Sequence, residues 1–111
     1  MRHMNDSVNL IVEFTKDKGY NDFITNIMMR EAVIRQIGII GEAANRLSKD
    51  FKKDYPDIEW IKIIGMRNRV VHDYFGINFR IVWETIQNRI PTLKEFTNKF
   101  ISEFDSQTSL L

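Results

Sequence analysis

The chain has 111 residues, 43% of them hydrophobic, and no cysteine, and its 16 basic and 15 acidic residues leave a net charge of +1. This length predicts one compact domain that would gain from oligomerisation, and the lack of cysteine excludes disulfides and cysteine-ligated metal sites, as is typical of a reducing cytoplasm. The balanced charge gives no sign of bulk affinity for nucleic acid, and the longest apolar run, residues 37–41, is far shorter than the roughly 20 residues that span a bilayer. We therefore expect a cytoplasmic protein with no membrane partner.

The N-terminal half predicts two helices. Residues 1–4 are set aside as a vector-derived tag or disordered leader, because a second methionine follows the first with no apolar segment behind it. The first helix spans about residues 5–18 and ends at Gly19, which suits a left-handed cap. The second spans about residues 21–49, and its apolar residues recur at steps of four and three: Val33, Ile37, Ile40, Ala44 and Leu47. Gly41 beside this stripe indicates the close approach of another helix, with a ligand contact as the alternative.

The C-terminal half predicts two further helices. Asp57 suits the cap of a third helix over about residues 58–72 or 58–73, and Asn78 suits the cap of a fourth. Pro91 interrupts the fourth helix and predicts either a kink near residues 87–91 or two consecutive helices. No strand-like alternation occurs, so the chain reads as one all-helical domain over residues 5–105, followed by a frayed tail at residues 106–111.

The stretch from Gly65 to Gly76 carries the most distinctive chemistry. His72 is the only internal histidine, and imidazole is the side chain best suited to proton transfer near neutral pH. Arg67 brings a planar guanidinium that stays charged and suits the negative charge that builds on phosphoryl oxygens. Residues five apart on a straight helix point about 140° apart. One helix would therefore present the pair poorly to a single phosphate, whereas two copies meeting at a symmetric interface would solve this.

Each neighbouring residue has a structural role beside its functional one. His72 could simply stabilise a helix C-terminus, and Arg67 could form a salt bridge, for example to Glu42, which is itself better suited to orienting a partner than to acid catalysis. Asn68 lies four residues before His72, so it could fix the imidazole tautomer, contact substrate or remain a surface amide. Arg69 lies three residues before His72, so it could add positive electrostatic potential at the opening of the same site, or it could be an ordinary surface cation.

The spacing Arg67, four residues, His72, one residue, Tyr74, with Asn68 directly after the arginine, resembles the signature of HEPN-domain proteins. It is most similar to the HepT-like toxins encoded beside MNT-type nucleotidyltransferases. Other segments match that family's pattern in order and spacing: residues 39–47, Tyr55-Pro56 with Trp60, residues 64–68, and residues 74–77 with Val82-Trp83. The resemblance covers roughly residues 8–100.

This resemblance implies an up-and-down antiparallel four-helix bundle of HEPN type that dimerises. It also implies a toxin that is a metal-independent endoribonuclease without a cofactor, cutting RNA by 2′-hydroxyl attack at a composite site built from Arg67 and His72 of both protomers. The partner would be an MNT-type nucleotidyltransferase antitoxin that attaches AMP to Tyr74. Two alternatives stay open. One is a non-catalytic nucleotide- or substrate-binding companion of the nucleotidyltransferase, and the other is an interaction scaffold in which the motif only packs.

Overall fold

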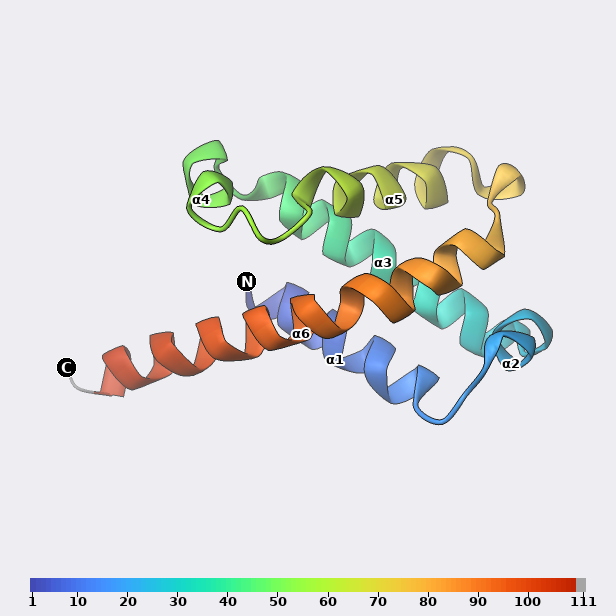
Figure 1. Ribbon diagram of the computed structural model, residues 1–111, viewed down its shortest axis with the longest axis horizontal. Coiled ribbons are helices and arrows are strands. Elements are labelled where there is room, and N and C mark those ends of the chain that lie inside the picture. The colour runs from blue at the N-terminus through green and yellow to red at the C-terminus, as the bar shows by residue number, and fades with distance from the viewer. Residues whose placement is uncertain (110–111) are drawn as a thin grey trace.

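The computed structural model describes residues 1–109, except for the side chains of Tyr74 and residues 107–109, and this part of the chain is helical with no strand. The expected all-α class is therefore confirmed. The elements in chain order (Figure 1) are α1 (Arg2–Thr15), α2 (Tyr20–Thr25), α3 (Ile27–Arg46), α4 (Lys49–Asp54), α5 (Trp60–His72), the 3₁₀ turn η1 (Tyr74–Gly76) and α6 (Phe79–Ser109).

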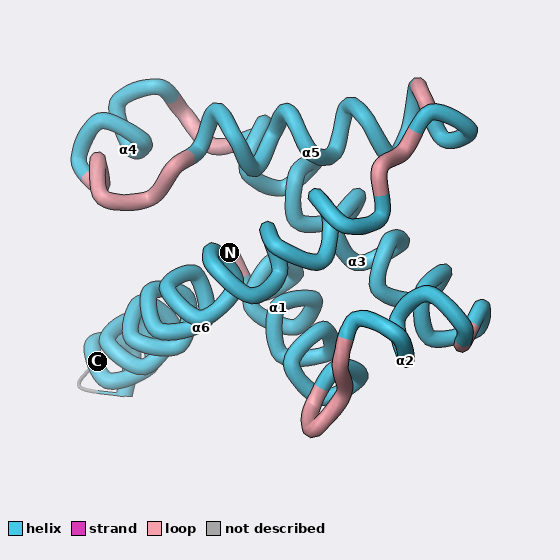
Figure 2. The backbone as a smooth tube through the Cα atoms, turned by 45° about the vertical axis from the view of Figure 1, so that its right-hand side comes forward, coloured by secondary structure: helices cyan, strands magenta, loops and turns pink. Residues whose placement is uncertain are grey.

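The longer helices pack in an order that differs from their order in the chain. α5 packs along α3, α3 packs along α1, and α1 packs along α6 (Figures 1 and 2). α1 and α6 run antiparallel, since Arg2 near the start of α1 forms an ion pair with Asp105 near the end of α6. The core between them is aliphatic and aromatic, and its fully buried apolar side chains come mainly from these helices: Met4, Val8, Ile11, Phe23, Val33 and Ala44.

Residues 2–4, set aside from the sequence as a leader, belong to α1. The side chain of Met4 has no exposed surface and lies in the hydrophobic core. The structure therefore packs part of this segment into the helical domain.

The end of the first predicted helix is wrong. α1 ends at Thr15, and the left-handed residue is Asp17, with φ of 58°, rather than Gly19. Gly19 instead precedes α2, where its N–H donates to Asp22 Oδ2 at 2.8 Å. The polar run after Thr15 thus forms a turn between two helices instead of the last turn of one helix.

The prediction of the second helix as a single element is also wrong, because the helix is interrupted at Asn26. Asn26 has an extended backbone, and its Oδ1 accepts a hydrogen bond from Met29 N at 3.1 Å, so it caps α3. A second break follows Arg46, where Ser48 Oγ accepts from Phe51 N at 3.0 Å and starts α4. The helical spacing of apolar residues continues across both breaks. The positions of the breaks follow the side-chain caps at Asn26 and Ser48 instead.

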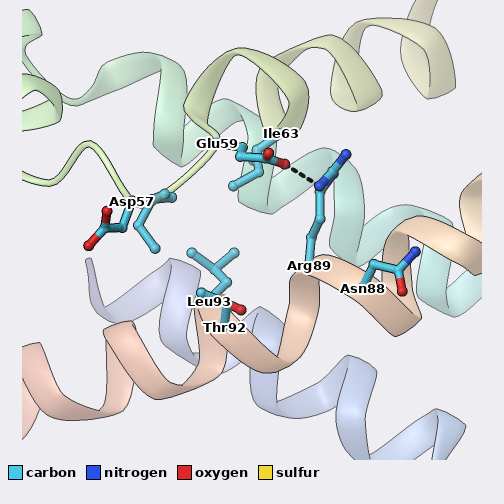
Figure 3. Close-up of a pocket in the computed structure, with 8 residues that line it drawn as sticks. Asp57, Glu59, Ile63, Asn88, Arg89, Thr92 and Leu93 are labelled. Atoms are coloured by element: carbon cyan, nitrogen blue, oxygen red, sulfur yellow. Dashed lines mark hydrogen bonds and ion pairs between the residues drawn. The ribbon is translucent and has the colours of Figure 1, made fainter.

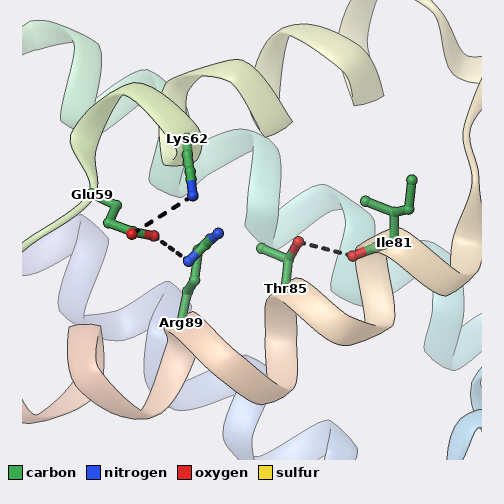
Figure 4. Close-up of polar contacts among 5 residues, drawn as sticks. All are labelled: Glu59, Lys62, Ile81, Thr85 and Arg89. Atoms are coloured by element: carbon green, nitrogen blue, oxygen red, sulfur yellow. Dashed lines mark hydrogen bonds and ion pairs between the residues drawn. The ribbon is translucent and has the colours of Figure 1, made fainter.

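The third helix begins two residues later than predicted. α5 starts at Trp60 with Glu59 as the preceding cap residue, so Asp57 does not cap it. Glu59 instead joins two helices, because it forms ion pairs with Arg89 of α6 and, at 3.7 Å, with Lys62 of α5 (Figure 4). The first turn of α5 is thereby fixed to α6.

The fourth helix starts as predicted and continues further. Asn78 Oδ1 accepts hydrogen bonds from Arg80 N at 3.0 Å and Ile81 N at 3.3 Å, which confirms its capping role. α6 then runs unbroken through Pro91, so the prediction of two consecutive helices is wrong, although proline removes one backbone bond from the helix. α6 continues through residues 106–109 of the predicted frayed tail, and residues 110–111 lie outside the described part. Within residues 1–109, no helix combines the length and apolarity needed to cross a membrane.

Candidate functional site

The candidate site lies on the C-terminal half of α5. Arg67 is half-buried near the middle of the helix, and His72 is its last residue and is exposed. Five residues separate the two by about 7.5 Å along the axis and about 140° around it. The two side chains therefore leave α5 in different directions, as the spacing predicted.

Arg67 points toward α3. Its Nη2 lies 2.9 Å from Glu42 Oε2, and Glu42 also pairs with Arg46 at 3.3 Å. The side chains of Arg67 and Glu42 are 25% and 39% exposed, so the pair sits at the edge of the solvent. The salt bridge that the sequence offered as the structural role of Arg67 is present, and Glu42 orients the guanidinium.

Gly41 makes this arrangement possible. A Cβ atom added at Gly41 would lie 2.0 Å from Arg67 Cβ and 2.6 Å from its Cγ, which is closer than any such contact allows. The backbones of α3 and α5 can approach here only because position 41 has no side chain. This favours the predicted helix contact at Gly41 over a ligand contact.

Asn68 also turns to Arg67. Its Oδ1 accepts a hydrogen bond from Arg67 Nη1 at 3.1 Å. The structure thus brings Glu42, Arg67 and Asn68 together, and the guanidinium is held by a charged acceptor on one side and a neutral one on the other. His72 is not part of this cluster.

His72 instead belongs to an exposed stripe along α5. Ile61, Gly65, Asn68 and His72 follow one another at steps of four, three and four, so they share one face of the helix. Ile61 is 87% exposed, and a Cβ added at Gly65 would meet no atom within 4 Å. Val71, next to this face, is 50% exposed. We call this set, Ile61, Gly65, Asn68, Val71 and His72, the α5 stripe.

Arg69 faces a cavity of about 310 Å³ beside the stripe. The cavity lies between α5, η1 and the first turns of α6, and Asp73, Gly76 and Asn78 line it as well. The sequence singled out Asn78 only as a helix cap. No sequence pattern could have found this cavity, because it forms where two helices diverge. The side chain of Tyr74 lies outside the described residues.

A separate cavity of about 240 Å³ lies at the opposite end of α5. Its lining includes the Glu59–Arg89 ion pair, Asp57 and Asn88 (Figure 3). Within this lining the charges of Glu59 and Arg89 neutralise each other. Within residues 1–109, no three His, Cys, Asp or Glu side chains gather in a way that could hold a metal ion.

Comparison with known proteins decides the family. Residues 4–100 match the family described as "Ribonuclease HepT-like". The chain belongs to this HepT-like family. The match covers nearly all of the helical domain and includes every residue of the candidate site, so the family that the signature resembled is confirmed.

Three relatives illustrate the similarity. A protein of Methanocaldococcus jannaschii named "Putative RNase" is 42% identical over 90 residues, which cover 81% of this chain and 83% of that protein. One of Caldanaerobacter subterraneus with the same description is 33% identical over 103 residues, covering 93% and 92%. The "Probable ribonuclease HepT" of Thermococcus cleftensis is 39% identical over 89 residues, covering 80% and 81%. No solved structure matches the chain.

Proposed function

We propose that this HepT-like protein is an endoribonuclease that acts as a dimer and cleaves RNA by attack of a 2′-hydroxyl on the adjacent phosphorus. The observation that carries the proposal is the placement of His72. It is exposed at the end of α5, on the same stripe as exposed apolar side chains, while Arg67 on the same helix is held in a fixed orientation. The ribonuclease names of the relatives support this reading.

The α5 stripe supports dimer formation. Ile61 and Val71 expose large apolar surfaces to solvent, and Gly65 between them leaves room for the close approach of another helix. A second copy of α5 packed against the first would cover both residues by a two-fold interface. Such an interface would bring two copies of His72 toward one phosphate, with Arg67 from each protomer beside them.

Cleavage would then divide two proton transfers between the protomers. The neutral imidazole of His72 takes the proton of the 2′-hydroxyl, the 2′-oxygen bonds to phosphorus, and the bond to the 5′-oxygen breaks. The protonated imidazole of the partner's His72 donates its proton to the departing 5′-oxygen, which leaves a 2′,3′-cyclic phosphate and a 5′-hydroxyl. Arg67 donates hydrogen bonds to the phosphoryl oxygens, where negative charge builds. These residues supply both acid–base catalysis and charge stabilisation, so we propose a reaction without a metal ion.

Glu42 and Asn68 act as positioning residues in this proposal. A guanidinium has five N–H donors, and only two of its nitrogens are engaged, Nη2 by Glu42 and Nη1 by Asn68. Remaining N–H groups stay available for phosphate. Fixing the side chain beforehand lowers the entropy cost of holding it in the transition state.

The test is cleavage of a mixed RNA substrate, including tRNA and mRNA, by the purified chain in EDTA. We expect cleavage by the parent chain and a loss of roughly 10²- to 10⁴-fold in rate for His72→Ala, the range for one general acid–base group. His3→Ala is the matched control, because His3 is an exposed histidine on α1, and it should cleave like the parent. No cleavage by the parent across these RNAs would contradict the proposal.

We further propose that the protein is the toxin of a toxin–antitoxin pair in the cytoplasm, with the bundle topology of HEPN proteins. An MNT-type nucleotidyltransferase partner would silence it by attaching AMP to Tyr74. The support is the position of this tyrosine, two residues beyond His72, where a bulky anionic group would obstruct the reaction centre. Incubation with such a nucleotidyltransferase and ATP should modify the parent and Tyr55→Phe but leave Tyr74→Phe unmodified. Adenylylation that persists on Tyr74→Phe would rule out Tyr74 as the acceptor.

One observation favours a second candidate function. Arg67 is neutralised by Glu42 in the single protomer, as expected if the residue is structural. The chain would then be a non-catalytic nucleotide- or substrate-binding companion of the nucleotidyltransferase. In that case the His72→Ala variant and the parent chain would bind the nucleotidyltransferase equally well. Neither the variant nor the parent would cleave RNA.

A further inference from the structure

The cavity beside the α5 stripe has the composition of a small-molecule site. At about 310 Å³ it lies at the lower end of the roughly 300–1,000 Å³ that is usual for ligand pockets. Its lining includes Arg69, Val70, Asp73, Gly76, Asn78 and Val82. Arg69 precedes His72 by three residues, so the mouth of the cavity is about one helical turn from the proposed reaction centre.

The lining separates into an apolar floor and a polar rim. Val70 and Val82 are buried at 7% and 2% exposure, whereas Arg69, Asp73 and Asn78 are exposed. A flat heteroaromatic ring fits such a surface, because its faces can contact the apolar floor while its edges form hydrogen bonds at the rim.

The rim groups have unused hydrogen-bonding capacity. Within the part of the chain that the structure describes, no ion pair or side-chain hydrogen bond engages the Arg69 guanidinium or the Asp73 carboxylate. Asn78 Oδ1 is occupied as the cap of α6, which leaves the amide N–H groups of Nδ2 as its free donors. The rim therefore offers one anionic acceptor and two sets of donors.

Gly76 leaves room for the carboxylate. A Cβ added at Gly76 would lie 2.6 Å from both Asp73 carboxylate oxygens, so any side chain at this position would displace the carboxylate from where it lies. Gly76 N also donates to Asp73 O at 3.0 Å. The turn η1 thus holds Asp73 through its backbone and leaves space for its side chain.

This set of groups selects among the bases. Guanine alone presents two adjacent N–H donors, N1–H and N2–H₂, on its Watson–Crick edge, and a carboxylate can accept both. Its O6 and N7 acceptors match side-chain donors such as arginine and asparagine. Adenine, cytosine and uracil each present an acceptor where the carboxylate would need a second donor.

We propose that this cavity binds a guanine base of the RNA, with Asp73 accepting from N1–H and N2–H₂ and with Arg69 and Asn78 donating to O6 and N7. The proposal rests on the proposed function, because the guanine belongs to the nucleotide whose 2′-hydroxyl faces His72. The cavity makes the enzyme selective for cleavage after guanosine in single-stranded RNA, where the base is free to turn into it.

Binding of mononucleotides tests the cavity without cleavage. Guanosine 3′-monophosphate should bind the full-length protein roughly 5- to 150-fold more tightly than adenosine 3′-monophosphate by calorimetry, the range for one bidentate base contact. Asp73→Asn replaces one acceptor oxygen by a donor and should abolish this preference. Asp6→Asn, the same change at an exposed position on α1, should keep it. Equal affinity of the parent for the two nucleotides, or an unchanged preference in Asp73→Asn, would overturn the proposal.

A second variant and a cleavage assay complete the test. Gly76→Ala leaves the carboxylate chemically intact but displaces it, and it should also reduce the guanine preference, so the result does not depend on the folding of Asp73→Asn alone. RNAs that differ only in the base before one cleavable bond then separate the two proposals. Guanine-selective binding without cleavage supports the cavity and contradicts the ribonuclease proposal, whereas cleavage with no base preference supports the ribonuclease and overturns the cavity.

Discussion

The two ends of α5 differ in how firmly they are attached to the rest of the molecule. At the first turn, Trp60 is 6% exposed, its Nε1 donates to Tyr55 O at 3.1 Å, and Glu59 forms an ion pair with Arg89 of α6. At the last turn, His72 is exposed and Val71 is 50% exposed. The first turn of α5 is thus attached to neighbouring elements, and its last turn is exposed to solvent. This indicates that the first end serves folding and that the last end is available for chemistry.

Trp60→Ala should break this attachment of the first turn, with the largest effect on stability. The indole contacts the rings of Phe51 and Phe96, with centroid distances of 6.4 and 5.9 Å, and truncating a buried tryptophan costs about 3–5 kcal/mol. Urea denaturation followed by circular dichroism measures this loss. Leu10→Ala, at a position on α1 that is 36% exposed, should cost at most about 1 kcal/mol. Equal losses in the free energy of unfolding for the two variants would show that Trp60 does not hold the first turn of α5 in place.

Gly41→Ala, on α3, tests the contact between α3 and the middle of α5, where Arg67 lies. The added methyl group would collide with Arg67, and such overpacking should cost about 1–3 kcal/mol and shift the guanidinium. Gly38→Ala is the matched control on the same helix, because no atom lies within 4 Å of its added Cβ, and it should stabilise the protein by about 0.5–1 kcal/mol through helix propensity. We therefore expect Gly41→Ala to lower the free energy of unfolding and Gly38→Ala to raise it, as measured by urea denaturation. A neutral Gly41→Ala would contradict the tight approach of α3 and α5.

Ile61→Glu tests whether the α5 stripe, which runs from the first to the last turn of the helix, is covered by a second copy. A two-fold interface would place two introduced carboxylates near each other, so self-association should weaken by about tenfold or more. Sedimentation equilibrium measures the association constant. Ile27→Glu makes the same change at a position on α3 that is 62% exposed but outside the α5 stripe, and it should leave association unchanged. If Ile27→Glu weakens association and Ile61→Glu does not, the interface lies elsewhere.

Much of the fold follows from residue types with one dominant local role. Asn78 was predicted to cap α6 and does so, and Gly41 was predicted to mark a close helix contact and lies against Arg67. The break at Asn26 was missed, because apolar periodicity continues across it and the hydrogen bond from Met29 N to the Asn26 side chain, which caps the start of α3, was not predicted. Of the two outcomes predicted at Pro91, division into two helices is wrong, because α6 continues through the proline with Ile90 and Leu93 buried on either side.

The candidate site divides in a similar way. The pairing of Arg67 with Glu42 could be named from the sequence, because an arginine near a small-residue helix face needs an acceptor. The hydrogen bond from Arg67 to Asn68 was not foreseen, since adjacent residues on a helix point about 100° apart and only the long arginine side chain closes the gap. The cavity at Asp73 depends on the path of η1 between α5 and α6, which no local pattern encodes.

The central claim, that the open end of α5 serves chemistry and not folding, is tested most directly by measuring two quantities on His72→Ala. We predict a free energy of unfolding within about 0.5 kcal/mol of the parent, because the side chain is exposed, together with RNA cleavage in EDTA reduced by roughly 10²-fold or more. A variant that cleaves RNA like the parent, or that loses activity only because it is unfolded, would contradict the claim.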